Sequence, residues 1–248
     1  MIIAAVNYLN TLPFVYGIEQ AGMGLRADLR VAVPSACADI IAAGEADISL
    51  VPVADIPRIA GGKIITDYCI GADGPVGTVA LFSNSALPRI HTVYLDSHSR
   101  TSVRLVRILA RERWGISPRW IDDKVASRRL NDGEALLAIG DKVFDMESSF
   151  FYKIDLAAEW KAHTGLPFVF AAWVARTAEG RDAAAGLNDA LRFGTGHIAQ
   201  SINGTWNREK QYDFDHAYDY LTHNIQFDLT EPKQKAMKLF WEKIITPG

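Results

Sequence analysis

The sequence predicts an α/β fold with mostly parallel sheets, and three observations support this prediction. Short apolar runs typical of strands alternate with helical segments almost from the first residue. The segments between consecutive strands are too long for hairpin turns, which favours crossover connections between parallel strands. The chain has 248 residues, of which 49% are hydrophobic and 22% charged, as in ordinary globular proteins. At this length, folding buries roughly three quarters of the surface that the unfolded chain exposes.

The first third of the chain contains two expected helices between strands. The first helix has Pro13 in its first turn, where the missing N–H costs no hydrogen bond. Pro34 begins the second helix in the same way, and Gly44 ends it, because glycine readily adopts the conformation of a helix C-cap. The expected order is strand 2–7, helix 13–20, strand 29–33, helix 34–43, and strands 47–51, 63–70 and 76–83.

A second alternating series follows, and the C-terminal third is expected to be helical. Residues 168–174 form the most apolar strand of the chain, and no strong strand signal follows it. The expected order is strand 92–96, helix 101–114, strands 119–121 and 135–139, helix 155–163, strand 168–174, and helices 178–193, 213–224 and 231–245.

Charge and hydropathy exclude two classes of partner. The 26 basic and 29 acidic residues give a net charge of −3, which is too near neutral for a nucleic-acid-binding protein. The longest apolar stretch, residues 168–175, is far shorter than the ~18 residues of a membrane span. We therefore expect neither nucleic acid nor a membrane as a partner.

The N-terminus and the cysteines favour a protein of the reducing cytoplasm. No basic residue precedes Arg26, and Asn7 interrupts the apolar start, so no secretory signal is recognisable. Cys37 and Cys69 lack CxxC spacing and are too few for a disulfide framework or a zinc site. Both lie in apolar surroundings, where we expect buried thiols.

The common catalytic motifs are absent from the sequence. It contains no GxGxxG or P-loop motif for nucleotides, no GxSxG nucleophile elbow and no HExxH zinc motif. The six histidines show no metal-ligand spacing. The sequence therefore indicates no cofactor and no metal, and an enzyme of this kind would use few side chains.

Polar side chains gather next to the expected strand ends, which is where open α/β sheets bind ligands. Tyr8, Asn10 and Thr11 lie between the first strand and the helix after it. They either cap this helix or hold a ligand. Ser35 opens the second helix, where a plain N-terminal turn and a ligand contact are the two alternatives.

Three further loops carry candidate residues. Ser99, Thr101 and Ser102 open a helix, where free N–H groups and hydroxyls favour an anion, although a simple N-cap would use only one hydroxyl. Thr78 follows a glycine-marked turn and leads into a strand. Asp141 follows another strand, and we expect it at the same ligand site.

Five segments resemble one family in order and spacing. They are NYLNTLPF (7–14), GEAD (44–47), SRTSVRL (99–105), LAIGD (137–141) and a longer run (155–173) that contains TGLPFVFA. They are similar to segments of the chorismate dehydratases of the futalosine route to menaquinone. YLNTLPF and TGLPFVFA are the specific segments, whereas GEAD and SRTS occur in many two-lobed binding proteins. The C-terminal helices resemble the family more loosely.

This resemblance implies a type II periplasmic-binding-protein-like fold, in which two α/β lobes enclose a central ligand cleft. Crossovers would lie near residues 79–83 and 170–176. Lobe I would then comprise residues 1–82 and 176–248, including the helical C-terminus, and lobe II residues 83–175.

The resemblance also implies a cofactor-free reaction with a small-molecule substrate. Water is removed from chorismate to give 3-(1-carboxyvinyloxy)benzoate, and the substrate's own enolpyruvyl carboxylate acts as the base. An asparagine and a serine hydroxyl assist in this family. Asn10 matches the asparagine, and the serine position falls on Thr78, which keeps the hydroxyl and adds a methyl group. The substrate-binding residues would be Tyr8, Thr11, Ser35, Ser99, Thr101, Ser102 and Asp141.

Two other functions are compatible with such a fold, because a fold alone does not specify chemistry. A solute-binding protein for an aromatic or dicarboxylic acid would share the cleft, but the expected lack of a signal peptide disfavours it. A ligand-sensing domain of a regulator is disfavoured because no DNA-binding segment is recognisable. Incubation with chorismate distinguishes the enzyme from both alternatives, because only the enzyme would convert it.

Overall fold

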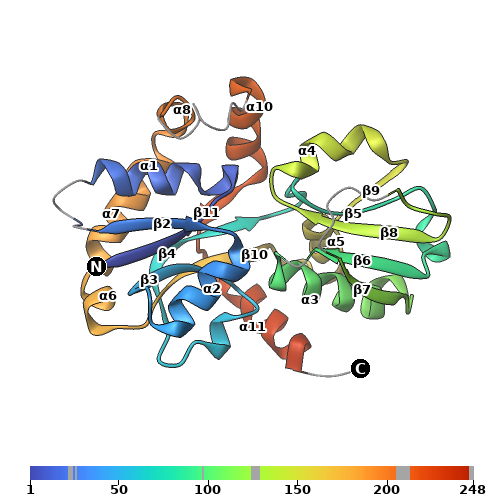
Figure 1. Ribbon diagram of the computed structural model, residues 1–248, viewed down its shortest axis with the longest axis horizontal. Coiled ribbons are helices and arrows are strands. Elements are labelled where there is room, and N and C mark those ends of the chain that lie inside the picture. Colours follow the sequence, from blue (N-terminus) through green and yellow to red (C-terminus); the bar gives the residue numbers. More distant parts are fainter. Residues whose placement is uncertain (22–24, 26, 97, 124–128, 205–212, 246–248) are drawn as a thin grey trace. The chain divides into compact units, whose positions relative to one another are not determined.

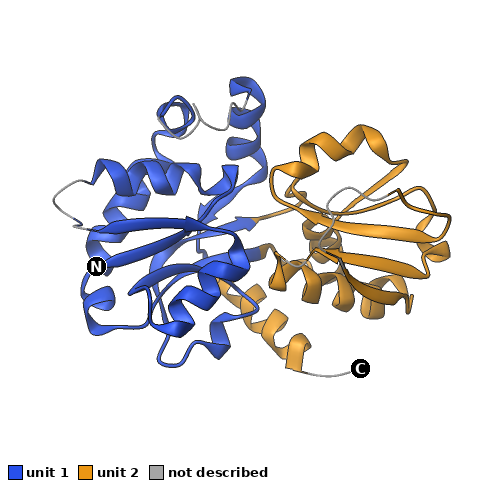
Figure 2. Ribbon diagram, in the orientation of Figure 1, with its two compact units in different colours: residues 1–71, 169–230 blue, residues 72–168, 231–248 orange. Residues whose placement is uncertain are grey.

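The chain forms two compact units, each built from two segments of the sequence. The computed structural model describes residues 1–21, 25, 27–96, 98–123, 129–204 and 213–245 (Figure 1). Unit 1 comprises residues 1–71 and 169–230, and unit 2 comprises residues 72–168 and 231–248 (Figure 2). Each unit contains one sheet with helices against it (Figure 1).

Unit 1 is built on a six-stranded mixed sheet of order β11-β4-β10-β3-β1-β2. Strand β1 pairs in parallel with both β2 and β3, whereas β10 is antiparallel to β3 and β11 is antiparallel to β4. The strands are β1 (Ile2–Val6), β2 (Asp28–Ala32), β3 (Ile48–Pro52), β4 (Lys63–Ala72), β10 (Phe168–Ala175) and β11 (Gln226–Asp228).

The helices of unit 1 lie on both faces of its sheet, with α1 and α7 on one face and α2 on the other (Figure 1). Helices α1 and α7 approach so closely that a Cβ atom at Gly17 would collide with the Ala190 carbonyl oxygen. A Cβ at Gly194 would collide with the carbonyl of Pro13, so glycine is required on both helices. The helices are α1 (Leu12–Gln20), α2 (Pro34–Ala43), α6 (Ala178–Asp182), α7 (Ala184–Thr195), α8 (Ile198–Ile202) and α10 (Phe214–Asp219).

Aromatic rings fill the core of unit 1 beneath α1. Phe14 meets Trp173 of β10 edge-on at 5.8 Å and Phe227 of β11 at 5.2 Å, and all three are buried. Such edge-to-face pairs add to the stability that burial alone supplies. They therefore help to keep the short strand β11 in the sheet beside β4.

Unit 2 is built on a five-stranded mixed sheet of order β7-β6-β8-β5-β9. Strand β6 is parallel to both β7 and β8, and β5 is antiparallel to both β8 and β9. Helices α3 and α5 pack against each other, and α4 packs on β8. The elements are β5 (Val79–Ser83), β6 (Thr92–Asp96), β7 (Arg119–Asp123), β8 (Glu134–Ile139), β9 (Tyr152–Asp155), α3 (Arg100–Leu109), α4 (Lys142–Met146), α5 (Leu156–Thr164) and α11 (Glu231–Ile245).

The C-terminal helix α11 belongs to unit 2. Phe240 of α11 meets Trp160 of α5 at 6.1 Å and Phe168 at 5.2 Å, both edge-on, and all three rings are fully buried. Glu112, in the π-helical turn after α3, accepts hydrogen bonds from Arg111 at 2.6 Å and from Lys243 of α11. These contacts join the end of the chain to helices that are distant in the sequence.

The α/β class and the two buried thiols are confirmed, and three details of the predicted fold need correction. The sheets are mixed rather than mostly parallel, because β5 and β10 enter them antiparallel to their neighbours. The short strands β9 and β11 were not predicted, since three or four residues give too little periodicity for a strand signal. The predicted helix 178–193 is two helices, α6 and α7.

The unit boundaries also differ from the lobes expected from the resemblance. Strand β5, expected to be the outward crossover, is a full member of the sheet of unit 2, and the chain leaves unit 1 already at the end of β4. Helix α11, expected in lobe I, packs in unit 2 because its apolar face covers Trp160 and Phe168.

We expect Glu112→Gln to lower the free energy of unfolding by about 1–3 kcal/mol near pH 7, because the Lys243 ammonium loses its partner. Burial alone would raise the pKa of the Glu112 carboxyl, but hydrogen bonds from Lys243, Arg111 and His163 lower it from 4.5 to about 2. The charged form is thus stabilised by folding. Urea melts measure the difference in the free energy of unfolding between the parent and Glu112→Gln. This difference should have its full value above pH 4.5 and disappear as the pH falls to about 2.

Glu231→Gln is the matched control for this measurement. Glu231 lies on helix α11, as Lys243 does, and forms an exposed ion pair with Lys235 at 2.8 Å. Its loss should therefore change stability by less than about 0.5 kcal/mol. Equal losses for the two variants would show that Glu112 does not hold α11 in place.

Candidate functional site

Four predicted site residues of unit 1 lie at one edge of its sheet. Strands β1 and β2 are parallel, so their carboxyl ends meet at the same edge. The backbone N–H of Asn7 donates to the carbonyl of Ala32 at 2.9 Å and holds the two strand ends together. Tyr8, Asn10 and Thr11 follow β1, and Ser35 follows β2 as the second residue of α2.

Asn10 has a fixed orientation and an unused amide nitrogen. Thr11 is fully buried, and its hydroxyl donates to Asn10 Oδ1 at 3.1 Å. The N-cap of α1 is Thr11, without a side-chain capping bond, so Asn10 does not cap this helix. Among the described residues, no group accepts a hydrogen bond from the Asn10 amide nitrogen. The half-buried NH₂ group is therefore available to a ligand.

Asn7 is a further polar residue at this edge and was not among the predicted site residues. Its side-chain oxygen is buried and has no hydrogen-bond partner among the residues that the structure describes. Ser35 is half-buried, and its hydroxyl likewise makes no hydrogen bond within the described chain. Asn7 lies directly after β1 and opens the NYLNTLPF segment, and this position is the signal that could have identified it.

The other predicted residues lie at one edge of the sheet of unit 2. Strands β6 and β8 are parallel and end there, and the antiparallel strand β5 begins there. The N–H of Gly140 donates to the carbonyl of Thr78 at 2.9 Å, and the N–H of Gly77 donates to Asp155 at 2.7 Å. Both glycines have positive φ (72° for Gly140 and 81° for Gly77), a conformation that favours glycine. The hydrogen bond from Gly140 places Thr78 beside the loop that contains Asp141. Thr78 is only 1% exposed.

The serines at the start of α3 act together as a helix cap. The Ser99 side chain accepts a hydrogen bond from the backbone N–H of Ser102 at 3.1 Å and donates to the Ser102 hydroxyl at 2.7 Å. Ser99 is therefore the N-cap of a ten-residue helix. Thr101 lies between the two serines in the same first turn, and all three side chains are buried. One of the two alternatives for this segment, helix capping, thus accounts for Ser99.

An ion pair with a buried carboxylate lies at the same edge of unit 2. Asp96 is the last residue of β6, and its Oδ2 atom lies 2.5 Å from Nζ of Lys142, the first residue of α4. Neither residue was predicted from the sequence, although Asp96 ends a strand and Lys142 directly follows the predicted site residue Asp141.

The sheet edges of units 1 and 2 that carry the predicted residues have polar groups suited to binding anions. They carry an amide, several hydroxyls, a capped helix N-terminus and an ammonium group, which bind and orient anions or polarise a hydroxyl. Within the described residues, histidine, cysteine and acidic side chains form no group of three that could hold a metal ion. The described helices also lack the length and apolar character needed to cross a membrane.

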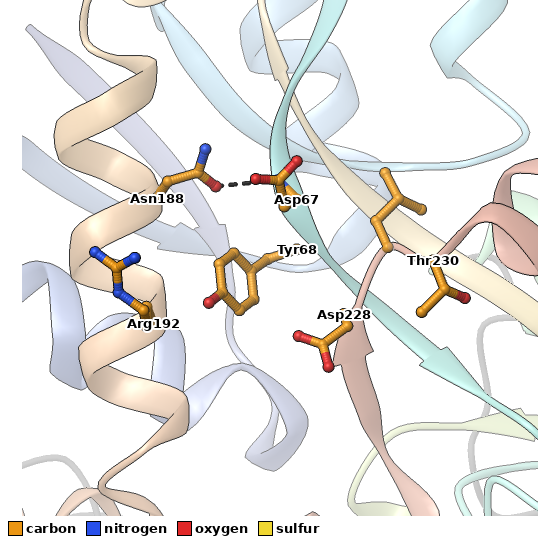
Figure 3. Close-up of a pocket in the computed structure, with 7 residues that line it drawn as sticks. Asp67, Tyr68, Asn188, Arg192, Asp228 and Thr230 are labelled. Carbon is orange, nitrogen blue, oxygen red and sulfur yellow. Dashed lines mark hydrogen bonds between the residues drawn. The ribbon is translucent and has the colours of Figure 1, made fainter.

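A separate polar cavity of about 240 Å³ lies in unit 1 and contains none of the predicted site residues. The N–H of Asp67 donates to Asn188 Oδ1 at 3.0 Å, and Arg192 of α7 lies beside the Tyr68 ring (Figure 3). Arg192 is paired with Asp189, and burial, followed by the charge of Asp228, raises the pKa of Tyr68. The lining residues are Asp67, Tyr68, Asn188, Arg192, Asp228, Leu229 and Thr230.

The chain is similar to known proteins along nearly its whole length. A family model described as menaquinone biosynthesis matches residues 1–245. Chorismate dehydratase from Thermus thermophilus is 25% identical over 261 aligned residues, which cover 97% of this chain and 94% of that protein.

Solved structures share the fold. A protein from Archaeoglobus fulgidus matches with a TM-score of 0.78 and 12% identity, over 98% of this chain and 95% of its own. A Candida albicans gene product, described as having the generic periplasmic binding protein fold, matches with a TM-score of 0.62 and 12% identity, over 99% and 93% of the two chains. The expected periplasmic-binding-protein-like fold is thereby confirmed. Since the family model spans all but the last three residues, the chain belongs to the menaquinone biosynthesis family.

Proposed function

We propose that the protein is a chorismate dehydratase, a hydro-lyase that converts chorismate to 3-(1-carboxyvinyloxy)benzoate and water in menaquinone biosynthesis. The observation that carries this proposal is the similarity to the Thermus thermophilus enzyme over 97% of the chain. The groups at the two sheet edges fit the chemistry of this elimination.

The reaction needs positioning and charge neutralisation more than a strong protein base. The ring C–H and C–OH bonds next to each other break, the hydrogen and the hydroxyl leave as water, and the ring becomes aromatic. Aromatisation favours the product strongly. The protein has to hold one conformer, neutralise two carboxylates and assist the departing hydroxyl.

Asn10 and Thr78 are the proposed catalytic residues. The substrate's enolpyruvyl carboxylate, oriented by the Asn10 amide, takes the ring proton. The hydrogen bond from Thr11 engages the Asn10 oxygen and leaves the NH₂ group as a donor, which supports this role. The Thr78 hydroxyl donates to the leaving oxygen. Neither side chain has to ionise.

The other predicted residues bind substrate. The first turn of α3 supplies N–H groups for a carboxylate, with Ser99 and Ser102 fixing the turn and Thr101 adding a hydroxyl. Tyr8, Thr11 and Ser35 line the edge of unit 1, and Asp141 lies next to Thr78 at the edge of unit 2. A cytoplasmic location is part of the proposal, motivated by the two free, buried thiols.

Purified protein should convert chorismate without an added cofactor, and EDTA should not slow the reaction. Loss of the diene absorbance and appearance of the product by mass spectrometry measure this. Chorismate that stays intact after overnight incubation with folded protein would refute the proposed function and favour a binding protein.

Asn10→Ala and Thr78→Val should each lower kcat by about 10²–10³ with little change in KM, because each removes a donor that acts mainly in the transition state. Thr78→Ser keeps the hydroxyl and should retain activity, which makes it the matched control. Variants that melt earlier but keep the parental kcat would mean that both side chains serve only packing.

Thr101→Val should raise KM about ten- to a hundredfold and change kcat much less, because one hydrogen bond to a charged group is lost. Steady-state kinetics and a thermal melt of the same variant test this. An unchanged KM together with a lower melting temperature would assign Thr101 to the helix start alone.

A further inference from the structure

We propose that Lys142 binds one of the two carboxylates of the substrate and that the buried Asp96 holds its ammonium group in place. This inference rests on the proposed function and adds to it a residue that determines specificity for dicarboxylates. The supporting observation is the ion pair between Lys142 and the buried Asp96 beside the start of α3 in unit 2.

The Asp96 carboxylate is fixed by its surroundings. Asp96 is 6% exposed, and its Oδ1 atom accepts a hydrogen bond from the backbone N–H of His98 at 3.0 Å. Its backbone carbonyl accepts from the N–H of Ser99 at 3.2 Å. The carboxylate is thereby attached to the segment that begins helix α3.

Lys142 is the partner of the second carboxylate oxygen. Oδ2 of Asp96 is buried, and Lys142 Nζ, 2.5 Å away, is its ion-pair partner. A buried carboxylate is costly unless a cation compensates it. His98, the other basic group beside Asp96, is half-exposed, with Nδ1 3.7 Å from Oδ1. The ammonium of Lys142 is therefore held next to the first turn of α3.

The pair leaves Lys142 able to bind a second anion. An ammonium has three N–H donors, and the ion pair with Asp96 occupies one side of it. The Lys142 side chain is 32% exposed, whereas Asp96 is almost entirely covered. The helix N-terminus and the ammonium both favour an anion here, while an uncompensated Asp96 would repel it. A carboxylate bound at this edge therefore needs Lys142.

The test combines kinetics with titrations. In the parent protein and in Lys142→Gln, chorismate kinetics are measured, and the product 3-(1-carboxyvinyloxy)benzoate and 3-hydroxybenzoate are titrated calorimetrically. We expect Lys142→Gln to raise KM and the Kd of the product about ten- to a hundredfold, with kcat changed less than about threefold. If 3-hydroxybenzoate also binds more weakly, Lys142 contacts the ring carboxylate; if only the product does, it contacts the enolpyruvyl carboxylate.

The double variant Asp96→Asn/Lys142→Gln separates direct binding from charge balance. It has the same net charge as the parent and leaves no buried charge unpaired, so it also serves if Lys142→Gln fails to fold. If Lys142 binds the carboxylate directly, the affinity of the double variant for the product stays low. Restored affinity would overturn the inference, because Lys142 would then only neutralise Asp96.

Lys153→Gln is the matched control. Lys153 has a similarly covered side chain (28% exposed) and is paired with Glu147, but it lies on the outermost strand β9, opposite Phe82 near the end of β5 that is away from Thr78. Its KM and Kd should equal those of the parent. If Lys142→Gln binds the product as tightly as the parent, the inference is wrong. If the parent does not dehydrate chorismate, the proposed function fails, and the product titrations still test Lys142.

Discussion

The pairing of β6, β8 and β5 is the constraint on which the edge of unit 2 depends. Parallel β6 and β8 end at one edge of the sheet, and antiparallel β5 begins there. Three loops that are far apart in the sequence are thereby brought together. The hydrogen bond from Gly140 to the Thr78 carbonyl then joins the start of β5 to the loop after β8. A hydroxyl, a helix N-terminus and an ammonium group can share one site only because of this strand order.

Electrostatics gives this edge its selectivity for anions. The first turn of α3 is capped by Ser99, and the partial positive charge of a helix N-terminus favours an anion beside it. The buried Asp96 would oppose an anion there, and Lys142 compensates it. In unit 1, the hydroxyl of Thr11 orients Asn10 in a comparable way, since it engages the amide oxygen and leaves the nitrogen as a donor. In both units, a buried polar group positions a partly exposed one.

The sequence predicted what depends on local pattern and missed what depends on distant contacts. The alternation of strands and helices, the cap at Gly44 and the positions of the polar loops follow from periodicity and turn chemistry, whereas capping by Ser99 was only one of two alternatives. The antiparallel entry of β5 and β10 depends on where the chain changes units, which periodicity does not encode. The packing of α11 on Trp160 and the pairing of Asp96 with Lys142 join residues that are distant in the sequence, so no local signal marks them.

The central claim is that the elimination uses neutral donors and the substrate's own carboxylate rather than a titrating side chain. The pH dependence of the single-turnover rate with saturating chorismate tests it most directly. The account predicts a rate that is constant between about pH 6 and 9, because neither an amide, a threonine hydroxyl nor a substrate carboxylate titrates in that range. A bell-shaped profile, or a rate that rises with an apparent pKa inside that range, would contradict it.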